Sequence, residues 1–157
     1  MDTPLKSCPA PGPVPTLEAS QRAAILGSVT IRGRAEEVSG ARAFVTRTLA
    51  ATGKGQRVDS DAATLLTSEL VTNAIVHTAS GSPDGSVTVV VVDVPDGVLI
   101  EVIDDGSGRT PVVKGGLFTA DGHGLYLVQQ LAAQWGYLRD AAGTTVWFHL
   151  AGDRPDG

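Results

Sequence analysis

Cysteine is nearly absent from this chain, which has 157 residues and only one cysteine, Cys8. A single cysteine excludes an intramolecular disulfide framework and a zinc site built on cysteine pairs. Basic residues are also scarce, 12 against 17 acidic ones, and the net charge of −5 argues against a nucleic-acid-binding module. The longest apolar run, residues 87–94, is too short to span a bilayer. We therefore expect neither nucleic acid nor a membrane as a direct partner.

Proline is unevenly distributed along the chain. Residues 1–16 hold five of the nine prolines, so this stretch can form neither a helix nor a sheet ladder. The N-terminus also lacks the basic start and the apolar run of a signal peptide. We expect a cytoplasmic protein with a flexible Pro-rich arm over residues 1–24, one folded domain over 25–151 and a tail over 152–157.

Hydrophobic periodicity predicts helices and strands in the order β-α-α-β-β-α-β-β. Asp59 is the expected N-cap of the second helix, and Pro95-Asp96-Gly97 indicates a tight hairpin turn. Hairpin-linked strands predict an α+β two-layer sandwich, with the helices on one face of a mixed, mainly antiparallel sheet. The expected helices are 36–51, 59–78 and 122–134, and the expected strands are 28–32, 87–94, 98–103, 135–139 and 144–150.

The second expected helix carries three polar side chains spaced by four residues, Glu69, Asn73 and His77. This spacing places them on one helix face. The amide oxygen of Asn73, the only asparagine of the chain, suits Mg²⁺, and a carboxylate one turn away can accept a proton. An ordinary polar face in solvent explains the trio equally well. Zinc fits less well, because no His-Glu-x-x-His pattern is present.

A second group of residues follows an expected strand. Strand alternation places Asp104 on the inward face with Val102, so its carboxylate needs a donor, and an adenine amino group is one candidate. Gly106 and Gly108 follow at a spacing of two, where backbone can approach a ligand closely. A plain loop with an Asx-turn is the alternative.

A third group opens the last expected helix, where Gly122 and Gly124 flank His123. Two glycines at a helix N-terminus leave backbone N–H groups free at the positive end of the dipole, which favours a phosphate. Simple helix-start chemistry, with Asp121 as the cap, is the alternative. The segment is neither a Walker loop, because no Gly-Lys-Ser/Thr follows, nor a Rossmann fingerprint, because a long loop precedes it.

The order of these motifs is more specific than any one of them. Glu-x3-Asn on a helix, Asp-x-Gly-x-Gly after a strand, Gly-x-Gly opening a helix and Gly143-Thr144 on the last strand together resemble the GHKL ATPase superfamily of gyrase, histidine kinases and MutL. The resemblance covers about residues 28–150 and implies the Bergerat fold of that superfamily. Glu-Leu-Val-Thr-Asn-Ala-Ile-Val-His and Gly-His-Gly-Leu-Tyr-Leu-Val are similar to its anti-sigma-factor branch, the RsbW/SpoIIAB-like serine/threonine kinases, in the compact form typical of actinobacterial regulators.

The resemblance implies an ATP site with Mg²⁺ and a role for each motif residue. Asn73 would coordinate the Mg²⁺ that bridges the phosphates, Glu69 would be the general base, and His77 would lie near phosphate. Asp104 would bond the adenine amino group, and Thr144, which strand parity puts on the core face, would reach the adenine through water. The other nucleotide contacts would come from the glycine motifs: Gly106, Gly108, Gly122, His123, Gly124 and Leu125.

The same resemblance implies a function. The protein would phosphorylate a serine or threonine of an anti-anti-sigma (STAS) partner, with ATP and Mg²⁺ as cofactors, and could also sequester a sigma factor. A nucleotide-gated protein-binding module without phosphotransfer is the alternative, although Glu69 favours the kinase. Relatives commonly form homodimers through the side of the sheet, but nothing in the sequence demands a dimer.

Charge is unevenly distributed along the chain. Residues 22–57 contain seven basic and two acidic residues, a net of +5, so the rest of the chain carries −10. A solvated helix face explains this excess as well as a partner surface does. On the second explanation, Arg42 and Arg47 of the first helix would dock an acidic partner, since charge complementarity steers encounter.

Overall fold

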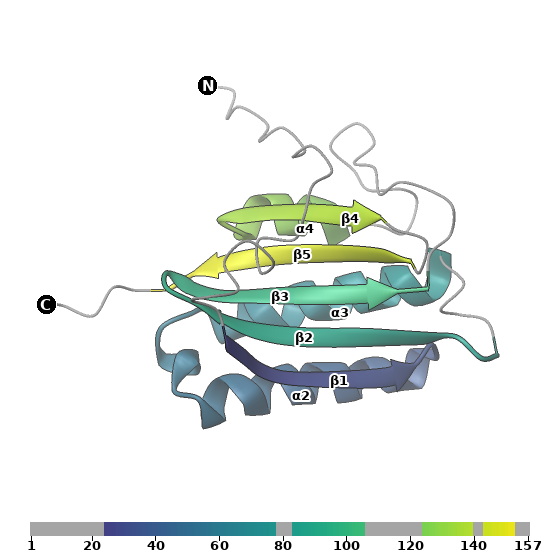
Figure 1. The fold of residues 1–157 in the computed structure, drawn as a ribbon, viewed down its shortest axis with the longest axis horizontal. Coiled ribbons are helices and arrows are strands. Elements are labelled where there is room, and N and C mark those ends of the chain that lie inside the picture. The colour runs from purple at the N-terminus through teal and green to yellow at the C-terminus, as the bar shows by residue number, and fades with distance from the viewer. Residues whose placement is uncertain (1–23, 78–82, 106–123, 140–142, 153–157) are drawn as a thin grey trace, which may run out of the picture.

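The computed structural model describes residues 24–77, 83–105, 124–139 and 143–152, which form a sheet and a layer of helices (Figure 1). Five strands lie in the order β1-β2-β3-β5-β4, and every neighbouring pair is antiparallel. The described sheet is therefore antiparallel throughout and not mixed. The strands are β1 (Ala24–Arg32), β2 (Ser86–Val94), β3 (Gly97–Asp104), β4 (Gln134–Arg139) and β5 (Thr144–Ala151).

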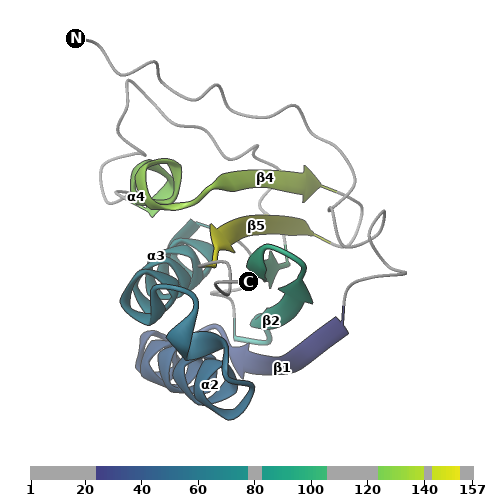
Figure 2. The same ribbon diagram turned by 90° about the vertical axis from the view of Figure 1, so that its left-hand side faces the viewer.

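The described α-helices all lie on one side of the sheet (Figure 2). They are α2 (Val38–Ala51), α3 (Ser60–His77) and α4 (Gly124–Leu131), with the short 3-10 turns η1 (Ala35–Glu37) before α2 and η2 (Lys54–Gln56) after it. This arrangement and the observed element order confirm the predicted α+β two-layer fold. None of the described helices has both the length and the hydropathy that crossing a bilayer requires.

The hydrophobic core fills the space between the helices and the sheet. On α2, Ala41, Val45 and Leu49 recur every four residues and are fully buried, as their periodicity predicts. On β5, Phe148 is the largest fully buried side chain and faces the same core. Burying a side chain of this size contributes about 1.5–3 kcal/mol. The core between the helices and the sheet therefore stabilises the packing of the two layers.

The start of α3 is capped as the sequence predicts. The Oδ1 atom of Asp59 accepts a hydrogen bond from the Ala62 backbone N–H at 3.0 Å. Such a cap satisfies one of the free N–H groups of the first turn and is worth about 1 kcal/mol. The cap fixes the residue at which α3 begins. The start and the length of the helix together determine which residues lie near its C-terminus.

Two described element boundaries differ from the expected ones by three residues or more. β1 begins at Ala24, earlier than the expected residue 28, because the chain pairs with β2 on both sides of an irregularity between Ile25 and Gly27. The third helix ends at Leu131 and not at residue 134. There the Ala133 N–H donates to the His149 carbonyl at 2.8 Å, which draws the backbone into the sheet.

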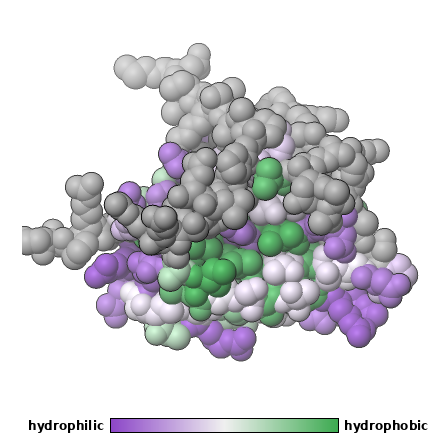
Figure 3. Space-filling model, viewed as in Figure 1, coloured by the Kyte–Doolittle hydropathy of each residue, from purple (hydrophilic) through white to green (hydrophobic). Residues whose placement is uncertain are grey.

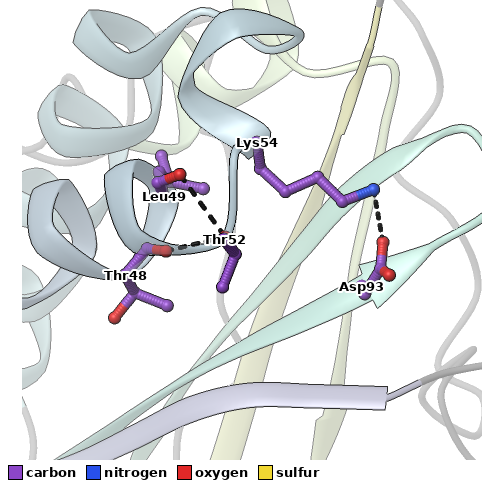
Figure 4. Close-up of polar contacts among 5 residues, drawn as sticks. All are labelled: Thr48, Leu49, Thr52, Lys54 and Asp93. Carbon is purple, nitrogen blue, oxygen red and sulfur yellow. Dashed lines mark hydrogen bonds and ion pairs between the residues drawn. The ribbon is translucent and has the colours of Figure 1, made fainter.

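One end of the sheet, which we call the turn end, holds Asp93 and the β2–β3 turn. Lys54 reaches across from η2 and forms an ion pair with Asp93, with 2.5 Å between Nζ and Oδ1 (Figure 4). Beside it, the Thr52 hydroxyl donates to the Thr48 carbonyl at 2.7 Å and closes the last turn of α2. The polar groups of the turn end therefore bond to one another.

Candidate nucleotide site

The opposite end of the sheet, which we call the site end, brings Asp104 and Thr144 together. Asp104 ends β3, Thr144 begins β5, and the two are paired across the sheet. The Thr144 backbone N–H donates to the Asp104 Oδ1 atom at 3.3 Å. Asp104 is 8% exposed and Thr144 4%, on the face that carries the core. Both inward orientations predicted from strand alternation are therefore confirmed.

Gly143 allows this close approach of β5 to β3. Its φ is +157°, and a Cβ added there would lie 1.8 Å from the Asp104 carbonyl oxygen. No side chain fits at that distance, so any other residue must displace the end of β3. In the sequence Gly143 is visible only as part of the Gly143-Thr144 motif, because its packing role depends on a long-range contact that spacing alone does not show.

Asp105 plays a different part from its neighbour Asp104. Its side chain is exposed, and its Oδ2 atom accepts a hydrogen bond from the Ser86 backbone N–H at 2.9 Å. Asp105 thus ties the start of β2 to the end of β3, while Asp104 stays buried beside Thr144. Sequence reasoning missed this role, although alternation already directs two adjacent carboxylates to opposite sides.

The predicted polar face of α3 lies at the same end of the molecule. α3 contacts β3, and Figure 1 shows it ending on the side where β3 ends. Glu69 and Asn73 are half-buried on this stretch of α3, while Leu70 and Ala74 between and after them are 4% exposed and pack into the core. The core residues therefore set the rotation of the helix and place Glu69 and Asn73 at its margin.

Asn73 has an unused hydrogen-bonding group. Its Nδ2 atom is buried and makes no hydrogen bond to any residue that the structure describes. A buried amide left unpaired costs about 1–3 kcal/mol. Oxygen and nitrogen of such an amide are assigned from the bonds they make, so the amide as a whole is what is available. An amide poised beside a carboxylate suits Mg²⁺, which keeps waters and phosphates as its other ligands.

The start of α4 completes the described part of the site end. β4 begins at Gln134, which pairs with His149 far from Thr144, so α4 leads away from the site end toward that point. α4 begins at Gly124, and its N-terminal dipole is therefore directed toward the site end. Leu125 follows Gly124 in the first turn.

Several predicted residues are placed only in part or not at all. His77 is the last residue of α3, but its side chain is not described. Gly106, Gly108, Gly122 and His123 lie outside the described residues, so their predicted contacts stay predictions. Arg42 and Arg47 are both exposed on α2.

A comparison with protein families decides which ligand this site is built for. The family model described as the histidine kinase-like ATPase domain matches residues 31–150. The chain belongs to this family. The match spans β1 to β5 and includes every described residue of the site end, which confirms the predicted GHKL superfamily and ATP as the ligand. A comparison with curated proteins gives no match.

The described residues fit ATP together with Mg²⁺. Asn73 supplies an amide oxygen as a metal ligand, and the described ranges hold no group of three or more His, Cys, Asp or Glu side chains that could hold a metal. Mg²⁺ held by one protein oxygen and by substrate phosphates is the usual arrangement in nucleotide sites. Asp104 supplies a buried acceptor for a base.

Proposed function

We propose that this protein is a Mg-ATP-dependent serine/threonine protein kinase of the anti-sigma-factor type. Its substrate would be a serine or threonine of an anti-anti-sigma (STAS) protein, and a sigma factor would be a second partner. The observation that carries the proposal is the spacing of Glu69 and Asn73 one turn apart on α3, where the buried Nδ2 atom of Asn73 has no described partner. This spacing supports a proton acceptor close to the side chain that would hold Mg²⁺.

Asp104 and Thr144 would select the base. The Asp104 carboxylate is buried and accepts a hydrogen bond from the Thr144 N–H. A carboxylate accepts several hydrogen bonds, so Asp104 would also accept one from the amino group of adenine. A hydrogen bond to a buried carboxylate is charge-assisted and about twice as strong as a neutral one. A base without an exocyclic amino group would not make this bond, which disfavours its binding.

Glu69 would act on the hydroxyl of the partner protein. The serine oxygen forms a bond to the γ-phosphorus, the bond from that phosphorus to the leaving ADP oxygen breaks, and the hydroxyl proton passes to the Glu69 carboxylate. Mg²⁺, when bound, neutralises charge on the phosphates. Asn73 orients this assembly, and the first turn of α4 at Gly124 offers its N–H groups to phosphate oxygens.

Arg42 and Arg47 would receive the partner. Both are exposed on α2, and they belong to a segment with a net charge of +5. A basic helix attracts an acidic partner and speeds its encounter.

Phosphotransfer onto STAS-domain proteins of the same genome tests this proposal. The full chain is incubated with Mg²⁺ and ATP labelled at the γ-phosphate, and phosphoserine on the partner is measured. Glu69→Gln should bind ATP as the native chain does and transfer phosphate about 10²–10⁴-fold more slowly. Asp61→Asn, a carboxylate-to-amide change on the exposed first turn of α3, is the matched control and should transfer normally.

Two results would contradict the kinase. Transfer by Glu69→Gln at the native rate would remove Glu69 as the base. Native chain that binds ATP yet labels no STAS protein would favour the nucleotide-gated binding module instead.

A further inference from the structure

The sheet face that points away from the helices carries a group of apolar side chains around Glu101, which is paired with Val90 and Trp147. Val90, Val92, Leu99 and Trp147 form a cluster there, which we call the outer cluster, and Val94, Ile103 and Leu138 pack against it. Figure 3 looks onto this face and shows hydrophobic residues gathered on its visible part. An antiparallel sheet with one face in water normally carries polar side chains on that face. The composition of this face therefore indicates that something covers it.

The exposure of the outer cluster agrees with a cover. Val92 and Leu99 are each 2% exposed, and Val90 and Trp147 each 8%, values as low as those of the helix-side core. Yet α2, α3 and α4 all lie on the other side of the sheet (Figure 2), so no described element packs on the outer cluster. The cover must be sought outside the described residues.

Trp147 presents a broad apolar surface on this face. A Cβ added to Gly136 on the neighbouring strand would lie 2.7 Å from Cζ2 of Trp147, so the missing side chain lets the indole extend over β4. Near it, the Nε2 atom of His149 is buried without a hydrogen-bond partner among the described residues.

Residues 1–23 have the length and the point of attachment that such a cover needs. They join β1 at Ala24, which pairs with Asp93, next to Val92 of the outer cluster. An extended chain of this length spans about 75 Å at most, whereas five strands are about 19 Å across. The segment can therefore cross the whole face of the sheet several times over.

The composition of residues 1–23 also fits this surface. The segment holds Leu5, Val14 and Leu17 and five prolines, at positions 4, 9, 11, 13 and 15. Proline has no N–H to satisfy, and its restricted φ lowers the entropy lost on ordering. Proline-rich segments dock on aromatic-lined surfaces by this chemistry, and Trp147 is the aromatic residue of the outer cluster.

We propose that residues 1–23 fold back over the outer cluster of their own chain and cover Trp147, Leu99 and Val92. This cover would be a built-in competitor for any second copy or partner that docks on the outer face of the sheet. The proposal is independent of phosphotransfer, because it concerns the side of the sheet away from the core and from Asp104.

A nitroxide label on Cys8 tests the proposal in the full chain, because Cys8 is the only cysteine and lies inside the segment. In the ¹⁵N-labelled protein, the indole N–H signal of Trp147 should lose most of its intensity while the nitroxide is paramagnetic and recover it after reduction. The Val45 amide on α2 should keep its intensity. In the matched control, Cys8→Ser with Arg47→Cys, the label sits on α2 and these two responses should exchange.

A mixed sample separates the possible occupants. Protein at natural isotopic abundance that carries the nitroxide on Cys8 is mixed with ¹⁵N-labelled protein that carries Cys8→Ser. In this mixture only contacts between two chains can broaden the ¹⁵N signals. The proposal predicts no loss at Trp147 in this mixture. Loss in the mixture would mean that a second copy brings its segment to the face, and no loss at Trp147 in either sample would mean that residues 1–23 do not lie there. Either result overturns the proposal.

Discussion

The turn end and the site end of the sheet belong to the same strands but differ in how their polar groups are bonded. At the turn end Lys54 pairs with Asp93, and the Gly152 N–H donates to the Asp96 carbonyl at 2.7 Å. At the site end the Asp104 carboxylate accepts a longer bond of 3.3 Å, and the Asn73 Nδ2 atom has no described partner. The β2–β3 turn is therefore closed by its own contacts, whereas α3 keeps a buried amide nitrogen without a described partner.

Asn73 is one of three described residues whose side chains hold a buried polar atom without a partner. Buried polar groups are normally hydrogen-bonded in folded proteins, so an exception calls for a reason. Trp135 Nε1 and His149 Nε2 are also buried without a partner among the described residues, and both lie in the half of the sheet toward the turn end. What distinguishes Asn73 is its place on α3 one turn after Glu69, inside the matched ATPase domain.

Replacing the glycine that closes each end should have the largest effect on stability. Gly97→Ala would place a Cβ 2.0 Å from the Leu150 carbonyl oxygen, and Gly143→Ala would place one 1.8 Å from that of Asp104. At φ of +147° and +157° both changes are also strained, so each should lower the free energy of unfolding by about 3 kcal/mol. Urea denaturation measures this loss.

The two glycine variants should differ once ATP is added. Gly143→Ala moves the end of β3 and should reduce the rise in melting temperature that Mg-ATP causes, whereas Gly97→Ala should keep the native rise. Equal rises in the two variants would show that the site end does not depend on Gly143.

Removing the Asn73 side-chain amide should stabilise the protein in the absence of nucleotide. Asn73→Ala eliminates a buried polar group with no described partner and introduces a better helix former, so we expect a gain of about 1 kcal/mol in the free energy of unfolding. Urea denaturation without nucleotide measures it. Thr72→Ala, an exposed neighbour on α3, controls for helix propensity. A loss of more than 1 kcal/mol in Asn73→Ala would mean that the amide has a structural role.

Breaking the ion pair of the turn end should have a smaller effect. Lys54→Met keeps the length of the side chain and removes its charge. Because the side chains of Lys54 and Asp93 are 17% and 39% exposed, water screens the pair, and the expected loss is at most about 1 kcal/mol. The affinity for Mg-ATP, measured by titration calorimetry, should equal that of the native chain. A weaker affinity would show that the turn end and the site end are energetically coupled.

Reversing charge on α2 should have the smallest effect on stability. Arg42→Glu with Arg47→Glu changes two exposed side chains, so the free energy of unfolding should stay within about 0.5 kcal/mol of native. The association rate with the STAS partner should fall, and it should depend less on salt. The docking proposal fails if the rate and its salt dependence are unchanged.

Local patterns predicted most of the fold. The four-residue spacing of Ala41, Val45 and Leu49 and the alternation along β3 and β5 specify which faces are buried, and both agree with the structure. The end of α4 was predicted wrongly, because the bond from the Ala133 N–H to the His149 carbonyl is a tertiary contact that no local pattern contains. The irregularity in β1 likewise depends on its pairing with β2.

For the site, the spacing of residues in the sequence predicted which way their side chains point better than it predicted which residues they contact. Helical periodicity placed Glu69 and Asn73 on one face, and strand parity turned Asp104 and Thr144 inward. The close approach of Gly143 to β3 could not be predicted, because it joins residues far apart in the sequence. A glycine directly before a strand that carries a motif residue was the available signal.

Binding of ATP to native chain and to Asn73→Ala, each with Mg²⁺ and with the metal chelated, tests the central claim most directly. Titration calorimetry gives the four affinities. Native chain should bind ATP more tightly with Mg²⁺ than without it, and Asn73→Ala should lose this dependence on the metal. Equal and tight binding by Asn73→Ala and native chain, both with and without Mg²⁺, would contradict the account.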